Sequence, residues 1–257
     1  EDTNVRAVFV QDQWARGKHR SFVALRMTDH ETFGDHLTWN AEYAYDIADD
    51  WTLNIGAGHA FRAPDATDRY GFGGSPDLEP ELADEAQFGL RYRPGQRHRF
   101  DLEAYYNDIR DLIEFNSISF VLENVSEAEI RGVQLAYQYE GDTVTVRANL
   151  VRQRADNAMT GDRLARRAEE TATLSVAKDI GRHRLGLDIV ASGDREDFGG
   201  VELPGYVLAN LSGQFSLFGN WSLNARIENL LDTDYETAAN FRMQPRSSFV
   251  ELKYKWR

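Results

Sequence analysis

The segment "VELKYKW" at residues 250–256 decides the fold class, because every second side chain in it is apolar. The two alternating sets are Val250, Leu252, Tyr254 and Trp256, and Glu251, Lys253 and Lys255. Since successive side chains of a β-strand point to opposite faces, this pattern places apolar groups on one face and charges on the other. We therefore expect a strand whose two faces meet different solvents.

The same alternation recurs upstream, for example over 37–45, 100–107, 207–215 and 221–228. About thirteen such segments of roughly ten residues are joined alternately by tight turns and by long polar loops, a repeat typical of membrane barrels. The tight turns are expected near 15–17, 48–50, 94–96, 140–142, 181–182 and 218–220, and long loops at 62–84 and 108–127. The chain is predicted to be all-β, a transmembrane antiparallel β-barrel with periplasmic turns and extracellular loops.

A soluble β-sandwich would show identical alternation with its apolar face turned inward. Aromatic residues beside the short turns and the C-terminus favour the barrel, since a membrane interface attracts amphipathic rings. They are Trp14, Tyr45, Trp51, Tyr92, Tyr139, Phe218, Trp221 and Trp256. The frequency of aromatics in any sheet remains the alternative explanation.

Composition narrows the function classes. A net charge of -13 argues against nucleic-acid binding, and the absence of cysteine excludes disulfides, thiolate metal sites and cysteine nucleophiles. The mean hydropathy of -0.55 does not exclude a barrel, because only alternate residues of its strands face lipid. No linker divides the 257 residues, so we expect one structural unit.

Catalytic and metal-binding patterns are weak. The six histidines are scattered singly, and His59 and Ser75 offer no convincing partners for a hydrolase, so neither an enzyme nor a metal or cofactor site is expected. Acidic residues cluster in "DREDF" (194–198) and "DLEPELADE" (77–85) without the ligand order of a calcium loop. We interpret both clusters as solvated loop charges.

Two places could contact a ligand. Arg166 and Arg167 follow a long loop, where guanidinium groups could hold ligand oxygens, although contact with acidic side chains in the lumen is an equal alternative. Phe198, followed by Gly199 and Gly200, could present its ring to a flat ligand. Packing at the loop tip would explain this phenylalanine equally well.

Four ordered blocks carry a family resemblance: "AFRAPDATDRYGFGGSPDLEPE" at 60–81, "YYNDIRDLIEF" at 105–115, "IRGVQLAY" at 130–137 and "RIENLLDTDYET" at 226–237. In these blocks the sequence resembles the TonB-dependent outer-membrane receptors, and most closely their cobalamin (vitamin B12) receptors. The resemblance covers essentially the whole chain. The departures include Ala83 and Gln87 in place of a usual Ser and Glu, and Arg257 after the terminal aromatic residue.

The resemblance implies that residues 1–257 are the C-terminal portion of a receptor barrel, about 13 of its roughly 22 strands. The plug domain and N-terminal strands would be absent. It further implies a multi-pass protein of the bacterial outer membrane, in contact with its lipid, that takes up cobalamin and is energised by TonB through the missing N-terminal region. A receptor for ferric siderophores is the alternative within the family.

The resemblance also implies roles for single residues. Arg166 aligns with a ligand-contacting arginine, and Phe198 falls near a contacting tyrosine whose hydroxyl it lacks. Arg69, Tyr70, Phe72 and Arg167 are further candidates in ligand-binding loops.

Overall fold

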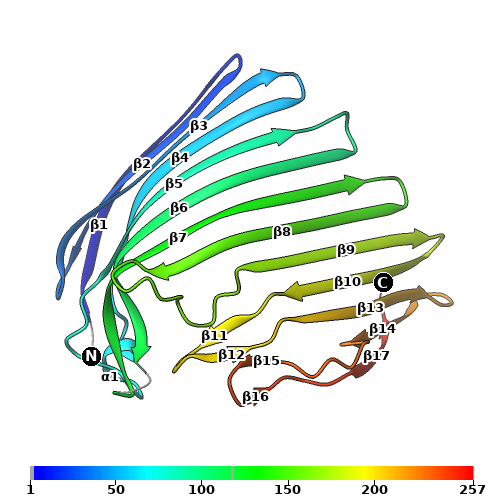
Figure 1. Cartoon of the computed structure of the whole chain (residues 1–257). Coiled ribbons are helices and arrows are strands. Elements are labelled where there is room, and N and C mark those ends of the chain that lie inside the picture. The colour runs from blue at the N-terminus through cyan, green and yellow to red at the C-terminus, as the bar shows by residue number, and fades with distance from the viewer. Residues whose placement is uncertain (1–2, 117–118, 257) are drawn as a thin grey trace. The chain divides into compact units, whose positions relative to one another are not determined.

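A computed structural model describes residues 3–116 and 119–256 of the chain, and strands account for most of them (Figure 1). The long strands are β1 (Val5–Arg16), β2 (His19–His30), β3 (Gly34–Ala48), β4 (Trp51–Arg62), β5 (Glu81–Tyr92), β6 (His98–Asn116), β7 (Val121–Glu140), β8 (Val144–Asn157), β9 (Glu170–Ile180), β10 (His183–Ser192), β13 (Tyr206–Ser216), β14 (Trp221–Glu228) and β17 (Ser247–Tyr254). The short elements are α1 (Ala66–Tyr70), β11 (Arg195–Asp197), β12 (Val201–Leu203), β15 (Glu236–Ala238) and β16 (Phe241–Arg242). Within the described ranges, no helix is both long and apolar enough to cross a membrane.

The thirteen long strands form one sheet in the order β1-β2-β3-β4-β5-β6-β7-β8-β9-β10-β13-β14-β17. Neighbours in the sheet are neighbours along the chain, apart from two hairpins, β11-β12 and β15-β16, which interrupt the sequence of long strands. The prediction of an all-β fold with about thirteen long strands is confirmed.

Glycines lie in the tight turns: Gly17 and Gly181 both have φ +59°, a left-handed conformation that glycine adopts without steric cost.

The register of neighbouring strands keeps apolar residues in line. Leu223 pairs with Leu252 and Ala225 pairs with Val250, while Asn224 pairs with Glu251 on the other face. Because side chains alternate along every strand, each face keeps one polarity across several strands. The pairing of neighbouring strands therefore preserves the alternation predicted from the sequence.

The chain divides into two compact units. Unit 1 comprises residues 1–91, 102–133 and 153–167, and unit 2 comprises residues 92–101, 134–152 and 168–257. Strands β6, β7 and β8 contribute their loop-side parts to unit 1 and their turn-side parts to unit 2.

Unit 1 contains a small hydrophobic core at the loop ends of its strands. The buried members are Leu112, Ala128, Ala155 and Leu164, with Ile109, Val125 and Ile130 packed against them. The expectation of a loop over 108–127 was wrong, because β6 continues to Asn116 and β7 begins at Val121. Burial of these apolar side chains stabilises the extended hairpin, which the local sequence alone did not indicate.

Candidate functional site

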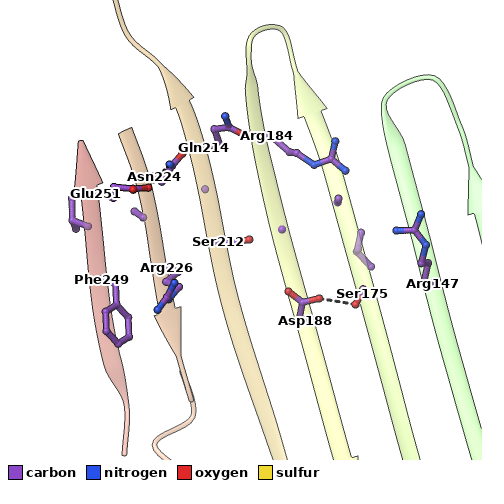
Figure 2. Close-up of a pocket in the computed structure, with 16 residues that line it drawn as sticks. Arg147, Ser175, Arg184, Asp188, Ser212, Gln214, Asn224, Arg226, Phe249 and Glu251 are labelled. Atoms are coloured by element: carbon purple, nitrogen blue, oxygen red, sulfur yellow. Dashed lines mark hydrogen bonds between the residues drawn. The ribbon is translucent and has the colours of Figure 1, made fainter. Parts of the chain in front are cut away.

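One face of unit 2 carries a groove of about 750 Å³, and many of the side chains that line it are polar or charged. Figure 2 shows nine polar side chains on adjacent strands, together with the ring of Phe249: Arg147, Ser175, Arg184, Asp188, Ser212, Gln214, Asn224, Arg226 and Glu251. They occupy the positions that the alternation assigns to the polar face. This face therefore suits a water-filled lumen.

The charges in this groove are largely balanced within the wall. Arg226 Nε lies 2.9 Å from Glu228 Oε1, and Arg184 Nη1 lies 3.3 Å from Asp179 Oδ1. Ser175 Oγ donates to Asp188 Oδ1 at 2.6 Å, and the Asn224 amide donates to Glu251 at 2.8 Å (Figure 2). Paired arginines hold an anion less strongly than unpaired ones, so the groove provides a hydrated wall and not a dedicated anion site.

The opposite face of the same strands exposes large apolar side chains. Val250 is 72% exposed, Leu252 58% and Leu150 52%. A soluble sandwich would bury this face under a second sheet, and contiguous apolar surface of this kind marks contact with a membrane or another protein.

Histidines mark the turn ends of several strands. His19 Nδ1 lies 2.6 Å from the Tyr43 hydroxyl, and His98 Nδ1 lies 3.0 Å from the Tyr137 hydroxyl. Together with His183, these histidines begin the strand after a tight turn, and each is followed by an arginine. These histidines are scattered in the sequence, but the repeated His-Arg pair two or three positions after a turn glycine was a signal that they share one position in the fold.

Arg69 stabilises the loop between β4 and β5. Its Nη2 and Nε donate to the Pro76 carbonyl at 3.2 and 3.3 Å, and its guanidinium lies 5.0 Å from the Tyr70 ring centre and 5.6 Å from that of Phe33. Phe72 is fully exposed and Tyr70 is 51% exposed. Arg69 thus orders the loop that presents two aromatic rings to solvent.

The same loop begins with a capped helix. Asp65 accepts hydrogen bonds from the backbone N–H groups of Thr67 and Asp68, and Asp68 accepts one from the N–H of Asp65, which completes a capping box at α1. The amides of Asp68 and Thr67 stabilise the charged carboxylate, so the pKa of Asp65 is lowered.

The paired arginines differ in their surroundings. Arg167 Nη1 lies 2.9 Å from Glu114 Oε1, so the competing interpretation, contact with an acidic side chain, holds for this arginine. Arg166 is exposed and has φ 62°, a left-handed conformation that is uncommon for a side chain of this size. Such backbone strain concentrates at functional positions.

Phe198 lies at the tip of the β11-β12 hairpin and is partly exposed. The interpretation of the acidic residues in "DREDF" as solvated charges was wrong for Asp197, which is 4% exposed, and the neighbouring Arg195 is also buried, at 5%. Their partners lie about forty residues away, in the β15-β16 hairpin, so no local signal could reveal their burial.

The block at 226–237 builds the turn that follows β14. Asn229 is buried, its side-chain oxygen accepts from the Thr233 N–H at 2.9 Å, and its amide donates to the Thr233 carbonyl at 2.9 Å. Asp232 accepts from the Arg246 N–H at 3.0 Å.

Over residues 3–116 and 119–256, no three His, Cys, Asp or Glu side chains are grouped so as to hold a metal ion.

Known proteins similar to this chain share its fold. The family model described as "TonB dependent receptor-like, beta-barrel" matches residues 1–230. The Vitamin B12 transporter BtuB of Vibrio vulnificus (strain YJ016) is 27% identical over 98% of this chain and 42% of its own length.

Two solved structures illustrate the fold. The copper transporter OprC superposes with a TM-score of 0.81 at 19% identity, over 98% of this chain and 47% of its own. A mutant of the ferric enterobactin receptor PfeA of Pseudomonas aeruginosa superposes with a TM-score of 0.81 at 18% identity, over 96% of this chain and 45% of its own. The chain thus spans less than half the length of these relatives.

Proteins of this family are transport receptors and not enzymes, and they reside in the outer membrane of Gram-negative bacteria, as the sequence predicted. The family model covers most of the chain, and the thirteen-stranded sheet has the alternation of a barrel wall. This chain belongs to the TonB-dependent receptors and forms part of their outer-membrane β-barrel.

Proposed function

We propose that residues 1–257 are one portion of the barrel wall of a transporter that takes up cobalamin with energy delivered through TonB. The observation that carries the proposal is the 27% identity to a vitamin B12 transporter, which extends over 98% of this chain. Coupling to TonB would require parts of the receptor outside these residues.

The extracellular loops supply the ligand contacts in this proposal. Tyr70 and Phe72 expose aromatic rings on a loop that Arg69 orders, and Phe198 presents a third ring on unit 2. Flat rings provide rigid contact area with little loss of side-chain entropy. Arg166, with its exposed guanidinium and left-handed backbone, would hold amide or phosphate oxygens of the ligand.

The wall itself separates two solvents. Exposed apolar residues such as Leu150, Leu252 and Val250 would face the outer-membrane lipid, and the groove of Figure 2 would face the lumen. The net charge of -13 gives no support for nucleic acid as a partner.

A ferric siderophore receptor is the second candidate. The similarity to the fold of the ferric enterobactin receptor, with a TM-score of 0.81, supports this candidate. At 18% identity that likeness concerns the fold, whereas the B12 transporter is matched at 27% identity.

Equilibrium binding to the natural full-length protein in detergent separates the two. We expect cyanocobalamin to bind at submicromolar concentration, and ferric enterobactin to bind far more weakly. Arg166→Ala should weaken cobalamin binding, whereas Arg163→Ala, in the same loop, serves as the control. Tight binding of ferric enterobactin, with no cobalamin binding at micromolar concentration, would refute the assignment.

A further inference from the structure

Two hairpins in unit 2 come from different connections between long strands, β10 to β13 and β14 to β17, and they contact each other. Strand β12 contacts β15, so the β11-β12 hairpin lies beside the β15-β16 hairpin (Figure 1). Neither hairpin belongs to the large sheet, and each has only two strands. Isolated two-stranded hairpins are marginally stable in water, so their mutual contacts decide how rigid they are.

One buried carboxylate connects the two hairpins. Asp197 Oδ1 accepts a hydrogen bond from the Phe198 N–H at 2.8 Å, and its Oδ2 accepts one from the Ala239 N–H at 2.5 Å. Asp197 is 4% exposed, and a buried carboxylate without donors is strongly unfavourable. Separation of the hairpins would therefore remove a charge-assisted hydrogen bond that the buried group requires.

Arg195 provides a second connection between the same hairpins. Its guanidinium donates to the backbone carbonyl of Glu236 and lies 5.3 Å from the centre of the Tyr206 ring. Arg195 is 5% exposed, so this contact is also shielded from water. Two buried charged side chains of β11 thus bond to the backbone of the β15-β16 segment.

Each connected hairpin presents an aromatic ring near its tip. Phe198 directly follows Asp197 in the β11-β12 hairpin. Phe241 begins β16, directly after Asn240 at φ 66°, and is 67% exposed. An exposed ring on an extracellular loop has unfavourable contact with water that a flat ligand would relieve.

We propose that Phe241 is a second aromatic contact for the ligand on unit 2, and that Asp197 is the positioning residue that fixes the Phe198 and Phe241 hairpins as one binding surface. The ligand class is a large metal chelate with a flat unsaturated ring system. The proposal rests on the proposed function for the identity of that ligand. The connection through Asp197 does not depend on it.

Hydrogen exchange on the full-length protein without ligand tests the connection. In Asp197→Ala, the peptide containing Ala239 should exchange at least about tenfold faster than in wild type, because its N–H loses a buried acceptor. Glu196→Ala, a change in the same short strand, is the matched control and should leave that peptide unchanged. Unchanged exchange at Ala239 in Asp197→Ala would overturn the positioning role.

Binding measurements test the contact, with cyanocobalamin and ferric enterobactin as separate probes. For whichever chelate the wild type binds, Phe241→Ala should weaken affinity about tenfold and Phe241→Tyr should retain it, since stacked rings contribute on the order of 1–3 kcal/mol. Phe218→Ala is the control, because Phe218 is 74% exposed but lies on a short turn at the other end of the strands.

The outcomes distinguish the two proposals. If wild type binds a chelate and Phe241→Ala binds it equally tightly, the contact is refuted while the transporter assignment stands. If wild type binds neither chelate, the proposed function fails, and hydrogen exchange still decides the role of Asp197. Asp197→Ala combined with Phe241→Ala should lose less affinity than the sum of the two single changes, because release of the β15-β16 hairpin displaces the same Phe241 ring that Phe241→Ala removes. Additive losses would contradict the positioning role.

Discussion

The guanidinium of Arg167 lies 2.9 Å from the carboxylate of Glu114, and this ion pair connects the segment after Leu164 to strand β6. Both side chains are partly shielded, with exposed fractions of 32% and 20%. The contact links residues 53 positions apart in the chain. It thus ties the segment that carries Arg166 to the extended β6-β7 hairpin.

Removal of this ion pair should cost stability. Arg167→Ala should lower the free energy of unfolding by about 1 kcal/mol, the upper end for a partly exposed pair. A double-mutant cycle with Glu114→Gln, measured by urea unfolding in lipid, should give a coupling energy of similar size. Strictly additive effects would mean that the pair contributes nothing.

Because the backbone at Arg166 is left-handed, two substitutions at this position should differ in stability but not in ligand affinity. Arg166→Gly should stabilise unit 1 relative to Arg166→Ala by about 1 kcal/mol, since glycine adopts φ 62° without steric cost. Both variants should lose cobalamin affinity to the same degree because both lack the guanidinium. Full affinity in either variant would remove Arg166 from the ligand site.

Truncation of one leucine in the small core of unit 1 should strongly reduce stability. Leu164 is 3% exposed, so Leu164→Ala should destabilise the folded state by about 3 kcal/mol through lost burial and a cavity. Met159→Ala, at a position 69% exposed in the same loop, should change stability by less than about 0.5 kcal/mol. Equal effects in the two variants, measured by thermal unfolding, would contradict the packing.

The capping carboxylate of α1 predicts a dependence on pH. Because the pKa of Asp65 lies below its ordinary value of 3.8, its contribution is complete above that pH and is lost as the pH falls through the lowered pKa. Protection of the Thr67 and Asp68 amides against hydrogen exchange should decrease over that acidic range. In Asp65→Asn, whose side chain caps without titrating at this position, the decrease should be smaller; an identical decrease would exclude Asp65 as its cause.

Local patterns in the sequence were sufficient for the strands. The alternation from Val250 to Trp256 depends only on neighbouring residues, so it predicted the faces that the Leu223–Leu252 pairing later aligned. The tight turns could also be predicted from the sequence, since Gly17 and Gly181 occupy left-handed positions in them.

Contacts between distant segments were not predictable in this way. The burial of Asp197 depends on the Ala239 N–H, which lies 42 positions further along the chain. Likewise, the extension of β6 through Leu112 depends on Ala128 and Leu164, which complete its core. A charged residue in a loop has the same local signature whether water or a distant backbone N–H solvates it.

In the barrel-wall assignment, alternate residues of each strand face hydrocarbon and water. Nitroxide labels at Leu223 and Asn224, placed singly in the full-length protein in lipid bilayers, test it by collision with dissolved oxygen and with a water-soluble nickel chelate. Oxygen should reach the label at 223 preferentially, and the nickel chelate should reach the label at 224. The reverse pattern, with position 223 exposed to the chelate and position 224 to oxygen, would contradict the barrel-wall assignment.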